Sequence, residues 1–193
     1  MKKINIEPER IFCPQPMYVI GTYNEDYTPN FGVITWIGFN WNGSPHIMLG
    51  VGGKKRTKEN IQRSKVFSAN LVSSDMLWLA DYFGCTHGDE GIKDKVKYEF
   101  TDGSSLKVPI LASSKWVVEC EVAETVELND SHIFVSEIKN IQIAEEFKNM
   151  DKEMIDLLKL DPVLYAPYNY FSLGKKLGNC GDWQNHYEKK SRP

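Results

Sequence analysis

The pattern of apolar positions along the chain favours short strands over long helices. Residues 17–24, 31–39 and 44–51 are rich in β-branched and aromatic residues, and turn-forming Asn, Asp, Gly and Pro residues separate them. This pattern predicts three consecutive strands arranged as a meander. A fourth strand is predicted at residues 65–73, where the composition is similar.

Two longer stretches predict a hairpin in the second half of the chain. Residues 114–128 alternate, so that the apolar side chains fall on one face and Glu119 and Glu121 fall on the other. Residues 132–144 continue the pattern after the turn-forming sequence Asn-Asp-Ser. We therefore expect two long antiparallel strands joined by a tight turn.

Helical spacing occurs in only a few places. Residues 73–84 carry apolar side chains at helical intervals, and Gly84 suits the left-handed residue that commonly ends a helix. Residues 151–160 predict a shorter helix closed off by Pro162. Residues 85–105 are polar and predict a loop with a short helix, and the aromatic, glycine-rich C-terminal tail has no clear period.

Many short antiparallel strands with few helices predict a mainly β fold. Closure into a full or partial barrel is favoured because it removes exposed strand edges. A doubly wound parallel sheet is disfavoured, since strands and helices do not alternate. The length of 193 residues suits one hydrophobic core, so we expect a single domain over residues 1–193.

The charge, the apolar runs and the cysteine content of the chain argue against several classes of function. A formal net charge of −3 argues against a surface that binds nucleic acid. No apolar run resembles a signal peptide or a membrane span, so we expect a cytoplasmic protein without membrane association. The four cysteines lie far apart without a C-x-x-C pair, which predicts free thiols in a reducing cytosol and no metal site.

One segment has the chemistry of an anion site. The sequence GGKKRTKENIQRS, residues 52–64, places basic residues and a threonine immediately before a short predicted helix. The start of a helix presents unpaired N–H groups and the positive end of the helix dipole, and both attract phosphate. The Walker spacing and the G-x-G-x-x-G pattern are both absent. The side chains that could contact the anion are those of Lys54, Lys55, Arg56 and Thr57.

The same residues also fit an ordinary solvated turn. Thr57 can cap the helix, and Asn60 can reach back to form a weak capping box. Three positive charges at a helix start oppose its dipole, however, which is a mild indication that an anion binds there. Spacing alone leaves both interpretations open.

The order of several segments resembles a known family. CPQPMYVIGTYN is followed by NFGVITWIGF, by HIMLGVGGKKRTKENIQRSKVFSANLVS and by LADYFG. Together they resemble the flavin reductase-like family of FMN-binding split barrels, which includes flavoredoxin-type proteins. The resemblance extends from about residue 10 to YFSLGKKLG near residue 178.

This resemblance implies a six-stranded antiparallel split β-barrel and a homodimer with non-covalent FMN near the subunit interface. The strand containing GVITW would lay its backbone along the flavin ring, and the basic segment would hold the phosphate. By position, the ring contacts would be Ile34, Thr35, Trp36 and Ile37, and the phosphate contacts would be Lys54, Lys55, Arg56 and Thr57. Asn60 and Asn70 are weaker candidates for the flavin site, and His87 is a possible donor to the flavin from the loop after DYFG.

The implied function is an oxidoreductase. Because redox chemistry belongs to the flavin, the chain needs no catalytic acid, base or nucleophile, and it shows no such constellation. We expect a flavin reductase that transfers hydride from NADH or NADPH to FMN. The alternatives are a flavoredoxin-like carrier that exchanges electrons with a redox-protein partner, and a barrel that has lost its flavin.

Overall fold

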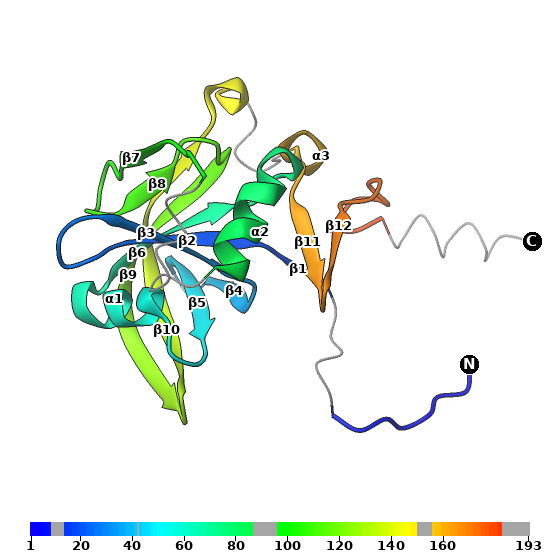
Figure 1. Cartoon of the computed structure of the whole chain (residues 1–193). Helices are drawn as coiled ribbons and strands as arrows, with labels where there is room; N and C mark the ends of the chain where they lie inside the picture. The colour runs from blue at the N-terminus through cyan, green and yellow to red at the C-terminus, as the bar shows by residue number, and fades with distance from the viewer. Residues whose placement is uncertain (9–13, 42, 87–95, 150–155, 183–193) are drawn as a thin grey trace, which may run out of the picture.

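A computed structural model describes residues 1–8, 14–41, 43–86, 96–149 and 156–182 (Figure 1). Its centre is a seven-stranded antiparallel sheet in the order β3-β2-β6-β9-β10-β5-β4. The predicted mainly β fold with short helices is therefore confirmed. The seven strands are β2 (Tyr18–Tyr23), β3 (Pro29–Ile34), β4 (Ile37–Trp41), β5 (Pro45–Val51), β6 (Val66–Leu71), β9 (Trp116–Leu128) and β10 (Ser131–Ile143).

The segment predicted as one strand at 31–39 forms two strands. β3 pairs with β2, whereas β4 pairs with β5, and these hairpins lie at opposite ends of the sheet order. Only Thr35 and Trp36 connect them, so the two edges of the sheet must meet and the sheet must curve into a barrel. The three predicted segments pair in chain order, but the middle segment changes its partner at Thr35 and Trp36. This split explains why seven strands form where six were expected.

The long hairpin is confirmed with small shifts at its ends. β9 and β10 pair along their length, with register irregularities between Val135 and Ser136 and between Ile138 and Asn140. Their turn contains Asn129 in the left-handed conformation at φ 53°, a conformation that asparagine tolerates well.

Helices are few and short among the described residues. They are α1 (Arg56–Ser64), α2 (Leu77–Cys85) and α3 (Leu157–Leu160), with single 3₁₀ turns at Ser74–Met76 and Glu145–Phe147. None of them has the length and apolar character needed to cross a bilayer. α3 ends before Pro162 as expected, and the start of the helix predicted at 151–160 lies outside the described residues.

Gly84 does not end its helix in the left-handed conformation, so that prediction was wrong. It lies inside α2, which continues to Cys85 and is followed by an extended Thr86. A Cβ atom on Gly84 would lie 3.4 Å from the Cβ atom of Val33. The absence of a side chain at Gly84 therefore allows α2 to pack closely against β3.

Two smaller sheets flank the barrel. β7 (Phe100–Asp102) pairs with β8 (Pro109–Leu111), and β1 (Gln15–Pro16), β11 (Val163–Ala166) and β12 (Asn169–Ser172) form a three-stranded sheet. Figure 1 shows β11 and β12 beside α2 and β1, at one side of the barrel. The β11–β12 hairpin arises from the tail in which the sequence showed no period.

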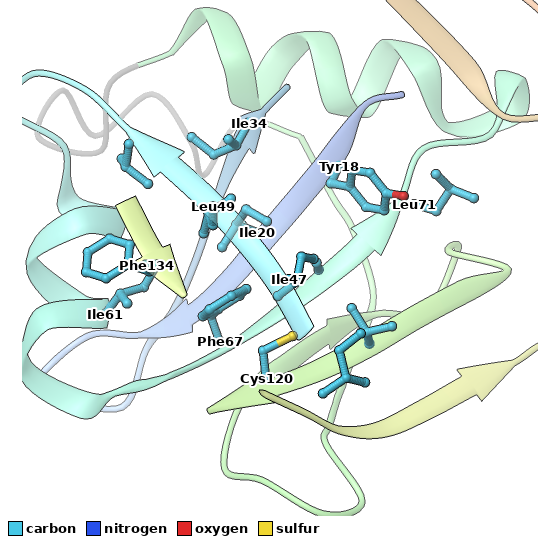
Figure 2. Packing of buried hydrophobic residues seen from close by; sticks show 14 of the residues in the cluster. Tyr18, Ile20, Ile34, Ile47, Leu49, Ile61, Phe67, Leu71, Cys120 and Phe134 are labelled. Carbon is cyan, nitrogen blue, oxygen red and sulfur yellow. The ribbon is translucent and has the colours of Figure 1, made fainter. Parts of the chain in front are cut away.

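The hydrophobic core has two parts because both faces of β2 are covered. Tyr18 and Ile20 point into the barrel, where they pack with Phe67 and Phe134 (Figure 2). Their chain neighbours, Met17 just before β2 and Val19 within it, belong to a second cluster under α2 and β11. Residues 17–20 form a continuous apolar run because a strand that is buried on both faces needs apolar side chains at consecutive positions.

Glu119 is buried although it occupies the polar face of β9. Its carboxylate accepts hydrogen bonds from the backbone N–H groups of Ser104, Ser105 and Leu106, and from the side chains of Asn140 and Gln142. Burial alone would raise the pKa of this carboxyl group, but these donors outweigh it and lower the pKa to about 2. Glu119 thus ties the 104–106 loop to the long hairpin.

We predict that Glu119→Gln lowers the free energy of unfolding at pH 7 by about 2–3 kcal/mol, because an amide cannot accept all of these hydrogen bonds. The carboxyl group titrates near 4.5 in an unfolded chain and near 2 in the fold. The unfolded state therefore binds the proton more tightly, so wild-type stability falls as the pH drops from about 4.5 to 2. The variant lacks this contribution, which urea unfolding across that range measures.

Glu121→Gln is the matched control on the same strand, because Glu121 is exposed and pairs only loosely with Lys139 at 3.3 Å. An unchanged pH dependence in Glu119→Gln would contradict the assigned role of the buried carboxylate.

Candidate functional site

A cavity of about 360 Å³ lies beside the connection between β3 and β4. Segments that are far apart in the sequence form its walls. Its lining residues are Met17, Val33, Ile34, Thr35, Trp36, Gly50, Gly52, Lys55, Gly84, Cys85, Tyr165, Pro167, Tyr168 and Tyr170.

The first wall is the β3–β4 connection. Ile34, Thr35 and Trp36 line the cavity. The Trp36 carbonyl accepts a hydrogen bond from the Gly50 N–H group at 2.8 Å, which holds the connection against β5. A Cβ atom on Gly50 would lie 3.3 Å from the Trp36 Cβ atom, so glycine permits this close approach. The structure thus brings together three of the four residues expected to contact a ring.

Ile37 is the exception among these four. It begins β4 opposite Leu49 and packs against the cluster inside the barrel. Strand alternation explains the difference, because neighbouring residues point to opposite faces once the strand resumes.

The basic segment lies at one end of the cavity. Lys55 lines the cavity and also occupies the N-cap position of α1, without a side-chain capping bond. Lys54 and Arg56 are exposed on either side of it, and the guanidinium group of Arg56 contacts the Glu59 carboxylate at 3.1 Å. The helix start therefore borders the cavity through Lys55, and its dipole and the neighbouring positive charges make this border electropositive.

Thr57 belongs to the framework of the fold. It is buried, and its hydroxyl oxygen accepts a hydrogen bond from the Asn30 side chain at 3.1 Å. A Cβ atom on Gly32 would lie 2.8 Å from that oxygen, so α1 packs tightly against β3 here. The helix-cap interpretation of Thr57 was wrong, because Lys55 is the N-cap residue.

Asn60 and Asn70 do not line the cavity either. The amide group of Asn60 donates to Thr22 at 3.1 Å and to Asn24 at 2.9 Å, which ties α1 to β2 and the turn after it. The amide group of Asn70 donates to the Val19 carbonyl at 2.9 Å. Both side chains are buried and engaged in the framework. His87 lies outside the described residues.

A second wall of the cavity was missed by sequence reasoning. It consists of Tyr165, Pro167, Tyr168 and Tyr170 from the β11–β12 hairpin, together with the end of α2. The segment YAPYNY does contain a signal that could have been used, because a proline-containing turn flanked by aromatic residues is typical of a hairpin.

Three polar groups meet where this hairpin contacts α2. The hydroxyl group of Tyr170 donates a hydrogen bond to the Asp81 carboxylate, and the Cys85 thiol lies 3.7 Å from the same oxygen. Burial, and then the neighbouring Asp81, raise the pKa of both Tyr170 and Cys85 above their ordinary values. Both groups therefore stay protonated at neutral pH, and Tyr170 anchors the hairpin to the helix.

Two other sequence expectations bear on the site. In the described part of the chain, no group of three His, Cys, Asp or Glu side chains is placed to hold a metal ion. Cys85, Cys120 and Cys180 are free thiols there, while Cys13 lies outside the described residues.

The model of the flavin reductase like domain family matches residues 10–174. The chain belongs to this family. Among solved structures, a flavoredoxin from Methanosarcina acetivorans superposes with a TM-score of 0.85 at 25% identity, covering 96% of this chain and 99% of that one. An FMN-binding protein from Thermus thermophilus with bound p-hydroxybenzaldehyde gives a TM-score of 0.75 at 19% identity, covering 93% and 97%. The YdfE protein of Bacillus subtilis (strain 168) is 24% identical over 191 residues, 90% of each chain.

Family membership agrees with the architecture. A split barrel of the flavin reductase like family is confirmed as the fold of this chain, and its cavity includes part of each segment that the resemblance had singled out.

We predict that Asn60→Ala lowers the free energy of unfolding by about 2–3 kcal/mol, because it removes the two hydrogen bonds that this buried amide donates to Thr22 and Asn24. Equilibrium urea denaturation measures the loss. Glu59→Ala on the same helix is the control and removes only an exposed ion pair, worth about 0.5 kcal/mol. Equal effects of the two substitutions would show that Asn60 is not a framework residue.

Proposed function

We propose that the protein is an FMN-binding oxidoreductase that transfers hydride from NADH or NADPH to FMN. The observation that carries the proposal is the composition of one cavity. Backbone from the β3–β4 connection and the basic start of α1 both border it. Membership of the flavin reductase like family supports the same conclusion, as does the similarity to an FMN-binding protein.

The residues present fit FMN, which combines a planar ring with a phosphate. Ile34, Thr35 and Trp36 offer an apolar and backbone surface for the ring. Lys55 and the N–H groups at the start of α1 offer a site for the phosphate, with Lys54 and Arg56 adding positive charge nearby. Thr57 and Asn60 act indirectly in this proposal, since they fix α1 against the barrel.

When bound, FMN supplies the capacity to accept a hydride and to pass electrons onward. The chain itself supplies position and an electrostatic environment. The β3–β4 connection is held in place by the bond between Trp36 and Gly50, so it offers a preformed surface. The positive charge around Lys55 favours anionic groups at that end of the cavity. Protonated Cys85 and Tyr170 add no negative charge of their own to the second wall, so the Asp81 carboxylate that they contact is the charged member of this group.

A flavoredoxin-like carrier is the second candidate function. The similarity to the flavoredoxin from Methanosarcina acetivorans favours it. In this case FMN would remain bound and would exchange electrons with a redox-protein partner, and no nicotinamide would bind.

A homodimer, implied by the resemblance, remains part of the proposal. An exposed apolar surface on the outer side of the sheet supports it: Met48, Val126 and Leu128 are 42%, 44% and 52% exposed. The strand register places Met48 opposite Val135 and Val126 opposite Ile133, so these residues share one face. Exposed apolar surface of this kind is typical of an interface between proteins. Cytoplasmic location remains a prediction from the sequence.

We predict that the purified protein binds FMN and that Lys55→Ala weakens binding about tenfold, which corresponds to about 1.4 kcal/mol for a charge-assisted contact to phosphate. Isothermal titration calorimetry measures the dissociation constant. Lys148→Ala is the matched control, since it removes one exposed positive charge that pairs with Glu145 away from the cavity. Unchanged affinity in Lys55→Ala would exclude this lysine from the phosphate site.

We predict that NADH or NADPH bleaches the visible flavin absorbance of the FMN-loaded protein under anaerobic conditions, because hydride transfer would convert oxidised FMN to its reduced form, which absorbs little visible light. Stopped-flow absorbance measures the rate with each nucleotide. Reduction by a redox protein but by neither nucleotide would favour the carrier instead. A protein that stays colourless after addition of FMN would contradict both candidate functions.

A further inference from the structure

Tyr168 occupies a strained backbone position in the β11–β12 hairpin. Ala166 pairs with Asn169, so Pro167 and Tyr168 alone form the turn. Tyr168 has a φ angle of 66°. Proline at the first central position and a positive φ at the second match the type II pattern, which favours glycine or asparagine at the second position. A bulky aromatic residue with positive φ is a genuine outlier.

Packing within the chain does not account for this strain. The side chain of Tyr168 is 84% exposed, so its ring adds little to the hydrophobic core. Its backbone N–H group donates to the Tyr165 hydroxyl oxygen at 3.3 Å, a contact that any residue except proline could make. Strain that the fold does not need is a reason to look for a functional role.

The position of the ring suggests that role. Tyr168 lines the cavity together with Tyr165 and Tyr170, and the same cavity is lined by Ile34, Thr35 and Trp36 of the proposed flavin surface. The hairpin is held there by the bond from Tyr170 to Asp81 of α2 and by backbone bonds from Val163 to Val72 and from Met17 to Val163. An aromatic wall is thus fixed at a set place relative to the β3–β4 connection.

We propose that Tyr168 is a nucleotide-binding residue that holds the nicotinamide ring of the reducing nucleotide. The inference rests on the proposed function, which assigns the β3–β4 wall to the flavin and leaves the tyrosine wall for the second ring. Planar rings stack favourably on aromatic faces. The oxidised nicotinamide ring also carries a positive charge, which the face of a tyrosine ring attracts. Tyr165 supports the turn, and Tyr170 is a positioning residue because it anchors the hairpin.

The test compares Tyr168→Asn with Tyr168→Phe in the full-length FMN-loaded protein. Asparagine tolerates the positive φ angle and removes the ring, whereas phenylalanine keeps both the ring and the strain. We expect Tyr168→Asn to weaken NAD⁺ or NADP⁺ binding about tenfold in isothermal titration calorimetry. We expect its Tm to equal or exceed that of the wild type, by up to about 4 °C. Tyr168→Phe should keep the wild-type Tm and bind the nucleotide within about twofold of wild type.

The outcomes separate this inference from the proposed function. If the wild-type FMN-loaded protein binds neither nucleotide, the nicotinamide-dependent function fails and the role of Tyr168 fails with it. If the wild type binds a nucleotide and Tyr168→Asn binds it equally well, only the role of Tyr168 is overturned. A change of oligomeric state in Tyr168→Asn, measured by analytical ultracentrifugation, with unchanged nucleotide affinity would also overturn it and would assign the ring to a subunit interface.

Discussion

The two-residue connection between β3 and β4 is the constraint on which the rest of the structure depends. Two residues span only about 7–10 Å between strand ends, yet the strands they join lie at opposite edges of a seven-stranded sheet. The sheet must therefore curve until its edges meet. Where the edges meet, Thr35 and Trp36 lie outside the regular strand pairing of β3 and β4. Both residues line the cavity.

The arrangement of α1 follows from the same barrel. Thr57 and Asn60 lie three residues apart and therefore on one face of the helix, and that face is buried against the polar side chains of β2, β3 and their turn. The basic residues before them remain outside, and Lys55 reaches the cavity. Buried hydrogen bonds thus determine the orientation of the helix, and that orientation determines which charges border the cavity.

Sequence reasoning succeeded where a local pattern has one physical solution. Alternation over 114–128 and 132–144 predicted the long hairpin, because one face had to be buried. It failed where burial depends on a distant segment. Glu119 lies on the polar face of its strand, but the 104–106 loop covers it and donates backbone hydrogen bonds to its carboxylate. The segment 31–39 is apolar throughout, and nothing local indicates that its strand changes partner at Thr35.

The sequence by itself determined most strands of the large sheet, the short helices, the family resemblance and the presence of a basic segment before a helix, since each depends on neighbouring residues. Only the tertiary structure decided which residues share the cavity. Tyr165, Tyr168 and Tyr170 lie far along the chain from Trp36 and Lys55, and barrel closure with the docking of the C-terminal hairpin brings them together. The physical reason is that periodicity records which face of an element is buried, but not which distant element covers it.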